Sequence, residues 1–372
     1  MKVTLLQENL KNSLIQLQKA IPSKPQLPIL ASILLNVGET EIVLSATDLY
    51  LGIRSRIQGE IKEVGQIAVP GEIFRQLIAS LPAGKIDLFT TEKSLVIKTA
   101  STRTQIPYQT GEEFPQFPDI GGLQAEITSI ELEELSSQVG FAISSDATRP
   151  VLTAMAFNFF KGSLEVAGTD GFRLSVLSLP PRQNIQDMRV LLPAKTFQEV
   201  NRIAQQNKTK SVIFQVDQDL KQVKFILDTT EIFVRMIEGD YPPYEKIIPT
   251  SFATKILLDP QTLLLELKRA VFFAKETSNI VRLTLSQGKI SILARSPSYG
   301  EYQSDVEVNG TVPNSFEVAF NATYVIDFLL AQEDDEIVIE ANESLKPVMF
   351  SSTKRVGQKY IVMPFRVSDM PS

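Results

Sequence analysis

The chain has 372 residues, of which 43% are hydrophobic and 22% charged, and this composition predicts a folded globular protein of two or three domains. It contains no histidine and no cysteine, which excludes disulfides, serine and cysteine triads, and the usual zinc and haem sites. The net charge of −6 argues against a protein that holds nucleic acid by charge alone. No third of the chain is strongly basic, because basic and acidic residues number 12 and 12 in residues 1–121, 13 and 16 in 122–249, and 12 and 15 in 250–372.

The first third of the chain alternates strands with two amphipathic helices. Leu10, Leu14 and Leu17 recur at helical spacing, and the proline after Ile21 ends that helix. A second helix is predicted to begin just after Pro70. The predicted strands span residues 2–5, 33–37, 41–46, 50–58, 85–89, 95–99 and 103–108, and a linker rich in glycine and proline spans 111–118.

Two short sequence motifs, called phrases below, each occur twice in the first two thirds of the chain. Residues 27–30 read Leu-Pro-Ile-Leu and precede Asp48, while residues 149–152 read Arg-Pro-Val-Leu and precede Asp170. Each aspartate lies 20 residues after the proline of its phrase and directly follows a threonine. Equivalent positions in two copies favour a structural role for these aspartates, an Asx-type turn that holds a hairpin, over a catalytic pair.

Longer segments repeat with a period of about 124 residues. Residues 190–197 restate residues 67–74 at a shift of 123 and lead into a helix, and a second linker follows at 238–244. A third copy begins its leading helix at Pro260 but lacks the Thr-Asp phrase. This period is far longer than that of solenoid repeats, so each copy is predicted to be a domain rather than one layer of a stack.

The order of elements within a copy predicts the fold class. Each copy reads as strand, helix, several strands, helix and several strands, and short turns between consecutive strands favour antiparallel pairing. The sequence therefore predicts an α+β protein of three similar domains, each with two helices packed on antiparallel sheet. The predicted domains span residues 1–121, 122–249 and 250–372.

Carboxylates are the remaining candidates for chemistry. The acidic run at residues 333–336 could hold magnesium, although a continuous run is more typical of a solvated turn, because metal ligands must converge. One alternative function is a carboxylate-dependent magnesium enzyme that uses Asp48 and Asp170. Another is a repeat-containing adhesin of the cell surface, which the missing signal-peptide core argues against.

The apolar run at residues 360–367 has a proline in its middle. Proline cannot donate a hydrogen bond to a neighbouring strand, so the run is predicted to be an edge strand or the lip of one. Linear apolar peptides commonly bind in grooves lined by such edges. The end of the chain is therefore a candidate binding surface.

Four phrases together resemble the family of bacterial DNA polymerase III beta subunits, the beta sliding clamps. They are the two pairings of a Pro phrase with Thr-Asp, then Asp-Tyr-Pro at residues 240–242, then Val-Met-Pro-Phe-Arg at 362–366. The resemblance covers the full length and has the same three-copy plan. It implies a processivity factor without catalytic residues or cofactors, located in the cytoplasm with the nucleoid.

The resemblance further implies the DNA clamp fold, in which two subunits join head to tail into a closed ring around duplex DNA. A ring holds DNA topologically and needs few cations, since strong binding would oppose sliding. The leading helix of the second copy carries Glu131, Glu133 and Glu134 and no cation, which predicts an uneven lining. The cations implied to face DNA are Lys11, Lys19, Arg75, Lys195, Arg202, Lys268 and Lys275 on helices, with Lys24 and Arg149 in loops.

A partner pocket between the second and third copies is also implied. It would take short apolar and acidic motifs from the DNA polymerase III alpha subunit, the clamp loader, other polymerases and repair proteins. Phe172 and Phe365 stand where other members often have a different residue. The implied pocket residues are Leu152, Thr169, Gly171, Phe172, Arg173, Leu174, Pro242, Lys246, Ile247, Asn321, Tyr324, Leu345, Pro347, Val362, Met363, Pro364, Phe365 and Arg366.

The head-to-tail homodimer implies a contact between the third copy of one subunit and the first copy of the other. Aromatic residues late on the leading helix of the third copy would meet a strand of the first copy, with a cation near an acidic partner. The implied interface residues are Phe272, Phe273 and Glu301 on one side and Arg103, Thr104 and Ile106 on the other.

Overall fold

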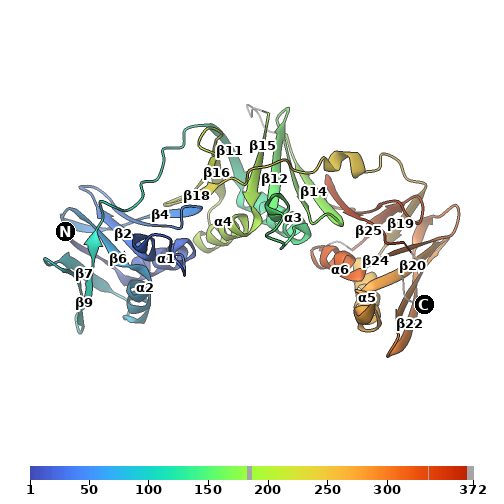
Figure 1. Ribbon diagram of the computed structural model, residues 1–372, viewed down its shortest axis with the longest axis horizontal. Helices are drawn as coiled ribbons and strands as arrows, with labels where there is room; N and C mark the ends of the chain where they lie inside the picture. Colours follow the sequence, from blue (N-terminus) through green and yellow to red (C-terminus); the bar gives the residue numbers. More distant parts are fainter. Residues whose placement is uncertain (182–186, 334, 367–372) are drawn as a thin grey trace. The chain divides into compact units, whose positions relative to one another are not determined.

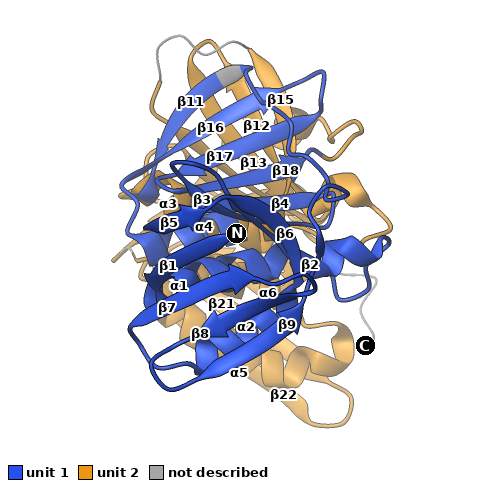
Figure 2. Ribbon diagram, turned by 90° about the vertical axis from the view of Figure 1, so that its left-hand side faces the viewer, with its two compact units in different colours: residues 1–129, 199–236 blue, residues 130–198, 237–372 orange. Residues whose placement is uncertain are grey.

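The computed structural model describes residues 1–181, 187–333 and 335–366, and its helices and strands follow the three-copy order (Figure 1). The chain packs into two compact units, residues 1–129 with 199–236 and residues 130–198 with 237–372 (Figure 2). The second copy is therefore divided between the units. Within the described ranges, no helix is long and apolar enough to cross a bilayer.

Unit 1 contains a nine-stranded antiparallel sheet made from the first two copies. Strand β4 of the first copy pairs with β18 of the second, with Gly52 opposite Phe233, and so joins the copies into one sheet. The strand order is β10 (Gln109–Thr110), β6 (Gly65–Pro70), β2 (Ser32–Val37), β3 (Ile42–Thr47), β4 (Leu51–Ile57), β18 (Thr230–Arg235), β17 (Gln222–Leu227), β16 (Ser211–Asp217) and β11 (Leu123–Thr128).

A second sheet of unit 1 has five antiparallel strands, with β9 at one edge. Its order is β5 (Gly59–Glu63), β1 (Lys2–Leu6), β7 (Lys85–Thr90), β8 (Ser94–Lys98) and β9 (Arg103–Pro107). Helices α1 (Gln7–Leu17) and α2 (Gly71–Ser80) pack side by side, and both contact strands of the nine-stranded sheet. Leu10, Leu14 and Leu17 of α1 are completely buried, as the helical spacing predicts.

Unit 2 repeats this plan with the second and third copies. Strand β14 pairs with β27, with Leu174 opposite Ile361. The nine-stranded sheet has the order β15 (Met188–Pro193), β12 (Ala154–Phe160), β13 (Ser163–Thr169), β14 (Arg173–Leu179), β27 (Gln358–Val362), β26 (Val348–Ser352), β25 (Ile337–Ala341), β19 (Thr254–Leu258) and β23 (Asn309–Thr311). A four-stranded sheet has the order β22 (Gly300–Glu307), β21 (Lys289–Ser296), β20 (Ile280–Ser286) and β24 (Phe316–Asn321).

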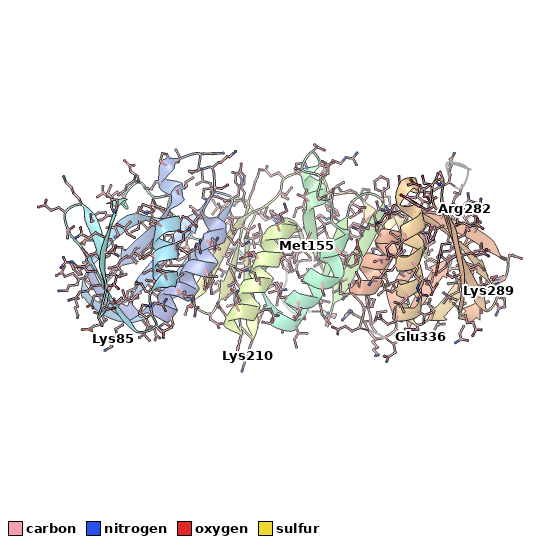
Figure 3. The ribbon with its side chains drawn as sticks, turned by 90° about the horizontal axis from the view of Figure 1, so that it is seen from below. Lys85, Met155, Lys210, Arg282, Lys289 and Glu336 are labelled. Atoms are coloured by element: carbon pink, nitrogen blue, oxygen red, sulfur yellow. The ribbon has the colours of Figure 1, made fainter. Side chains whose placement is uncertain are left out.

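Helices α5 (Pro260–Ala274) and α6 (Ala322–Leu330) pack together in unit 2, and α5 covers the four-stranded sheet. Met155 of β12 is completely buried, whereas Lys289 of β21 is exposed and lies 3.2 Å from Asp305 (Figure 3). The remaining α-helices are α3 (Ser129–Val139), which belongs to unit 2 apart from its first residue, and α4 (Ala194–Asn207), which is divided between the units after residue 198.

Most predicted elements are present, but the prediction for the first copy lacks three of its strands, β5, β6 and β10. The predicted strand at residues 50–58 is present as β4, one residue shorter at each end, and a separate strand, β5, follows it and pairs with β1. Residues 27–30 and 149–152 form short 3₁₀ turns, Pro28–Ala31 and Pro150–Thr153, which enter β2 and β12. These turns explain why the two proline phrases recur at the same distance from the Thr-Asp phrases.

Candidate functional site

The Thr-Asp phrase of the second copy forms the predicted Asx-type turn between β13 and β14. One oxygen of Asp170 accepts from the backbone N–H groups of Phe172 at 2.9 Å and Arg173 at 3.0 Å. The hydroxyl of Thr169 accepts from the backbone N–H of Gly171 at 3.0 Å and donates to the carbonyl of Arg173 at 2.5 Å. Gly171 has a φ of +94°, in the region that glycine adopts without strain. The turn therefore presents Phe172, half of which is exposed, at the surface.

The C-terminal segment joins the two sheets of unit 2 beside this turn. The N–H of Met363 donates to the carbonyl of Phe172 at 2.9 Å, which extends the pairing of β14 and β27. The N–H of Phe365 donates to the carbonyl of Ala319 on β24 at 2.7 Å. The rings of Phe172 and Phe365 stack with centroids 6.5 Å apart and planes 12° apart. Pro364 lies between the two bonded residues, as expected for a segment that leaves a sheet edge.

Arg173 links the turn to helix α6. Its guanidinium lies 3.0 Å from Asp170 and 2.6 Å from Asp327, and it stacks over the ring of Tyr324 at 4.7 Å. Burial alone would lower the pKa of Arg173, but the Tyr360 hydroxyl and the two carboxylates raise it above its usual range. The guanidinium therefore stays charged and can hold the turn and the helix together.

The predicted pocket residues all belong to unit 2, and they differ in exposure. Leu152, Thr169, Leu174 and Val362 are buried, so they support the surface rather than form it. Asn321 caps helix α6, since its side-chain oxygen accepts from the N–H of Thr323 at 2.9 Å. The predicted residues that are exposed or half-buried are Gly171, Phe172, Arg173, Pro242, Lys246, Ile247, Asn321, Tyr324, Leu345, Pro347, Met363, Pro364, Phe365 and Arg366.

The junction between the first and second copies has the same backbone bonds. The N–H groups of Tyr50 and Leu51 donate to Asp48 at 2.8 and 2.6 Å, and the N–H of Leu49 donates to Thr47 at 2.9 Å. The N–H of Arg235 donates to the carbonyl of Tyr50 at 2.9 Å, as Met363 does to Phe172. The two junctions are thus copies of one arrangement.

Buried glutamines also lie at both junctions, and they were not predicted from the sequence. Gln16 on α1 donates to Asn207 at 2.8 Å and accepts from Thr230 at 2.9 Å. Gln138 on α3 donates to the carbonyl of Ala331 at 2.6 Å and accepts from Gln332 at 3.0 Å and from Gln358. The signal in the sequence is the shift of 122 residues between Gln16 and Gln138, which matches the shift between the Thr-Asp phrases.

The predicted dimer residues lie on two edge strands and one helix. Phe272 on α5 is two-thirds exposed, whereas Phe273 stacks on Tyr302 of its own chain with centroids 5.9 Å apart. Arg103 is exposed and Thr104 half-buried on β9, the edge of its sheet.

Two other residues of the predicted interface make contacts within their own chain. The side chain of Ile106 is buried in its own domain, with 5% exposed, so it can reach a partner only through its backbone. Glu301 on β22, the edge of the four-stranded sheet, is paired with Arg295 of its own chain at 3.1 Å.

The predicted DNA-facing cations are at least partly accessible. Arg75 is paired with Glu72 at 2.7 Å, and Arg202 is paired with Glu199, each three residues earlier on its helix. The hydrogen bond from Arg75 lowers the pKa of Glu72. Those classed as exposed are Lys19, Lys24, Arg149, Lys195, Lys268 and Lys275, and Lys11 is half-exposed.

The carboxylates proposed for an enzyme have structural partners instead. Asp48 and Asp170 hold their turns through backbone N–H groups. In the acidic run, Asp334 lies outside the described residues, and Asp335 is exposed and pairs with Lys354 at 2.8 Å. Among the residues that can be described, no group of three or more acidic side chains is arranged to hold a metal ion.

Comparison with known families agrees with this geometry along the whole chain. The N-terminal domain model of the DNA polymerase III beta subunit matches residues 1–118, the central domain model matches 126–243, and the C-terminal domain model matches 245–366. A beta sliding clamp from Synechocystis is 28% identical, with 99% of this chain and 100% of that protein covered. One from Staphylococcus aureus is 26% identical, with 94% of each covered.

Solved structures of similar proteins have the same fold. The DNA polymerase III beta subunit of Thermotoga maritima is 28% identical and superposes with a TM-score of 0.89 over 98% of this chain and 99% of that chain. The beta subunit of Pseudomonas aeruginosa, at 24% identity, supports the fold alone, with a TM-score of 0.93 over 99% of this chain and 100% of that chain. The predicted fold class, three similar α+β clamp domains, is confirmed.

The matched domains follow one another in order and leave few residues of the chain outside them. The carboxylate-dependent enzyme finds no support among these relatives. The chain belongs to the family of bacterial DNA polymerase III beta subunits, the sliding clamps of DNA replication, which are processivity factors and not catalytic enzymes.

Proposed function

We propose that this protein is a head-to-tail homodimer that closes into a ring around duplex DNA. The observation that carries the proposal is the way its copies join. At both internal junctions the last strand of one copy pairs antiparallel with the strand after the Thr-Asp turn of the copy before it, β18 with β4 and β27 with β14. The corresponding strands that have no partner at an internal junction are β9 of the first copy and β22 of the third copy. Each lies at the edge of its sheet.

Pairing β22 of one subunit with β9 of the other would repeat the internal junctions. An exposed strand edge presents unpaired N–H and C=O groups and readily pairs with another chain. The turn before β22 supports the correspondence, because the hydroxyl of Ser296 accepts from the N–H of Ser298 at 3.2 Å, two residues later, as the threonines of the other two copies do. Arg103 on β9 and Glu301 on β22 would then lie near each other across the seam, close to Phe272.

We further propose that the nine cations, seven on helices and two in loops, face the DNA. Their small number suits a protein that must move along the duplex, since each phosphate contact adds salt-dependent affinity and resists sliding. Residues 1–121, 122–249 and 250–372 would be the three domains of each subunit. The protein would work in the cytoplasm with the nucleoid, because its ligand is chromosomal DNA.

The surface around Arg173, Phe172 and Phe365 is proposed to be the partner groove. Apolar rings and the half-buried Met363 and Pro364 offer contacts for a short apolar peptide, and exposed Lys246 and Arg366 offer charge for an acidic residue beside it. The partners would be the DNA polymerase III alpha subunit, the clamp loader, and other polymerases and repair proteins with short linear motifs.

A topological experiment tests the ring. The protein is loaded on a nicked circular plasmid by a clamp loader, and gel filtration measures how much stays with the DNA before and after a single restriction cut. We expect retention on the circle and loss from the linear product. Equal retention on both would mean that the protein binds DNA by contact rather than by encirclement, and would overturn the ring.

A further inference from the structure

The junction between the first and second copies repeats the bonds that support the proposed partner groove, yet its surface is covered. Leu49, with a φ of +76°, takes the place of Gly171, and Tyr50 takes the place of Phe172. Both Leu49 and Tyr50 are exposed, by 42% and 63%. The first junction therefore carries an apolar rim of the same kind.

A side chain from the linker fills the floor of this junction. Gly52 stands where the other junction has Leu174, since each lies opposite the corresponding strand residue, Phe233 or Ile361. The ring of Phe117 lies directly over Gly52, and a Cβ built on Gly52 would be 2.2 Å from that ring. Phe117 thus occupies the space that a leucine side chain takes at the other junction.

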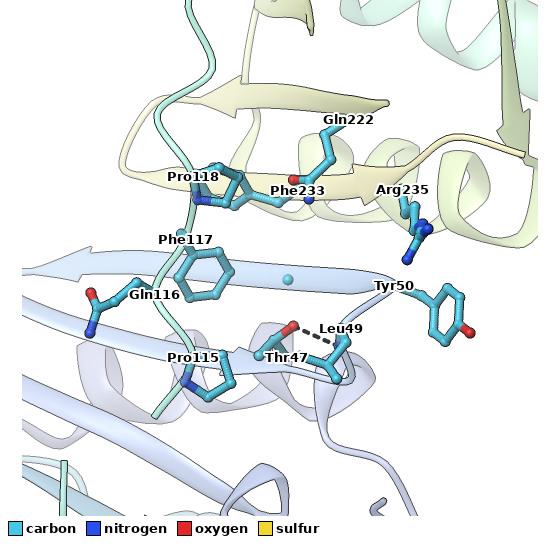
Figure 4. A pocket seen from close by; sticks show the side chains of 11 residues that line it. Thr47, Leu49, Tyr50, Pro115, Gln116, Phe117, Pro118, Gln222, Phe233 and Arg235 are labelled. Atoms are coloured by element: carbon cyan, nitrogen blue, oxygen red, sulfur yellow. Dashed lines mark hydrogen bonds between the residues drawn. The ribbon is translucent and has the colours of Figure 1, made fainter. Parts of the chain in front are cut away.

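Neighbouring groups hold this ring in place. The centroids of Phe117 and Phe233 are 4.7 Å apart, and the guanidinium of Arg54 lies 5.0 Å from the Phe117 ring. Arg54 is in turn paired with Glu231 at 3.1 Å. Beside the ring a cavity of about 90 Å³ remains, into which the linker and the rim residues face (Figure 4).

The second linker packs on its junction in another way, with Tyr241 and Tyr244 in the same buried cluster as Leu174 and Ile361. Its aromatic counterpart, Tyr244, donates to Glu165 at 2.6 Å and accepts from Asn158 at 2.7 Å, on strands β13 and β12. Burial raises the pKa of Tyr244 above its usual range, so the hydroxyl remains a donor. The two linkers therefore pack differently on two equivalent junctions.

We propose that the first junction is a latent peptide groove that the chain's own linker occupies through Phe117, which limits each subunit to one partner site. The inference rests on the proposed partner groove at the second junction. Its occupant in the native protein is the Pro-Gln-Phe-Pro segment at residues 115–118, and an apolar peptide of the partner class binds there when Phe117 is removed. Gly52 leaves room for the ring of Phe117, because a side chain at position 52 would occupy the space of that ring.

The test counts peptides bound per chain by isothermal titration calorimetry, with the pentapeptide Gln-Leu-Ser-Leu-Phe as the probe. The native protein is expected to bind one peptide per chain. Phe117→Ala opens the floor and is expected to bind two. Gly52→Leu keeps the linker sequence but displaces the ring and restores the leucine of the other junction, so it is also expected to bind two. Phe160→Ala, which removes an exposed ring elsewhere, is the matched control and keeps one.

A shortened chain that ends at Val362 separates this inference from the proposed function. Without its tail the chain is expected to bind peptide about a hundredfold more weakly, too weakly for the titration to count, and the shortened chain with Phe117→Ala is expected to bind one peptide tightly. If the native protein binds none while Phe117→Ala binds one, the proposed groove is wrong and the latent groove stands. If Phe117→Ala and Gly52→Leu, both folded by circular dichroism, bind no more peptide than the native protein, the latent groove is overturned.

Discussion

At the scale of single residues, Arg173 joins the turn after β13, helix α6 and the C-terminal strand. Replacing it with alanine leaves Asp170 and Asp327 without their shared cation, and we expect a loss in partner-peptide affinity of about tenfold, or about 1.4 kcal/mol. Arg173→Lys is expected to recover little, because an ammonium cannot reach both carboxylates and stack on Tyr324. Fluorescence anisotropy with a labelled peptide measures the loss.

The control for Arg173 is another arginine in the same unit. Arg189 is 42% exposed and pairs with Glu245 at 3.1 Å, so Arg189→Ala should change peptide affinity by less than about 0.5 kcal/mol. An Arg173→Ala protein with native peptide affinity would show that the cluster serves stability only.

Asp259 predicts a dependence of stability on pH. It caps helix α5, and the Thr262 hydroxyl together with the N–H groups of Gln261 and Thr262 lowers its pKa below the usual 3.8. Its charged form therefore stabilises the fold above about pH 4, and this contribution disappears as the pH falls through the lowered pKa. Asp259→Ala is expected to cost about 1 kcal/mol at pH 7.

Urea unfolding at pH 7 and at pH 3 measures this effect. The difference between Asp259→Ala and the native protein should shrink at the lower pH, while Asp259→Asn, which can still cap the helix, should unfold near the native midpoint at pH 7. A difference that persists unchanged at pH 3 would mean that the charge contributes nothing.

At the scale of elements, the buried glutamines hold the copies together. Gln138→Ala removes the acceptor of the Gln358 amide, one of the two acceptors of the Gln332 amide, and the side-chain donor to the carbonyl of Ala331. We expect a loss of about 2 kcal/mol in unfolding free energy, because buried unsatisfied polar groups cost about 1–3 kcal/mol each and the site can relax. Gln261→Ala, an exposed glutamine on α5, is the control, and equal melting temperatures for the two variants would contradict the role given to Gln138.

The structure shows where the C-terminal tail can be cut without loss of a strand. Val362 is completely buried and pairs with Arg173, so a cut before it would damage β27. Removal from Met363 onwards leaves that strand intact, and we expect a folded dimer that encircles DNA but binds partner peptides about a hundredfold more weakly, or about 2.7 kcal/mol. Native peptide affinity in the shortened, dimeric protein would rule out this groove.

The elements that the sequence predicted are those with a local signal. Leu10, Leu14 and Leu17 define a helix by their spacing, and the Thr-Asp phrases define turns by their own side-chain bonds. The turn of the third copy was not predicted, because Ser296 replaces the threonine and no aspartate follows. Strand β5 was missed because its five residues face solvent for the most part and carry no apolar alternation.

The candidate site was predicted less completely than the fold. Its residues follow from the resemblance, but the burial of Leu174 and Val362 depends on which strands become neighbours. The pairing of β14 with β27 joins residues almost 190 positions apart, from Arg173 to Val362, and no local pattern encodes that distance. The position of Phe117 over Gly52 likewise appears only when the linker is seen against the sheet.

At the scale of the whole molecule, the ring depends on contacts between subunits. Changing Phe272 and Phe273 together to alanine should give monomers, at a cost of several kcal/mol of lost aromatic burial per interface. Because Phe273 packs on Tyr302 of its own chain, Phe273→Ala alone is the control for damage within the domain. Sedimentation at micromolar concentration measures the change, and a native protein with the mass of one chain would contradict the ring.

The linkers at residues 111–118 and 238–244 connect neighbouring copies of the chain. The two internal junctions therefore differ from the proposed seam between subunits in the free energy of closing. Strands joined by a short tether meet at an effective concentration on the order of millimolar, however dilute the protein becomes. The proposed β9–β22 seam has no tether, so its closure alone follows the concentration of free subunits. If strand pairing is equally strong at all junctions, a loader that strains the ring evenly opens it at the seam, because a tethered junction that parts will reform before its strands can diffuse away.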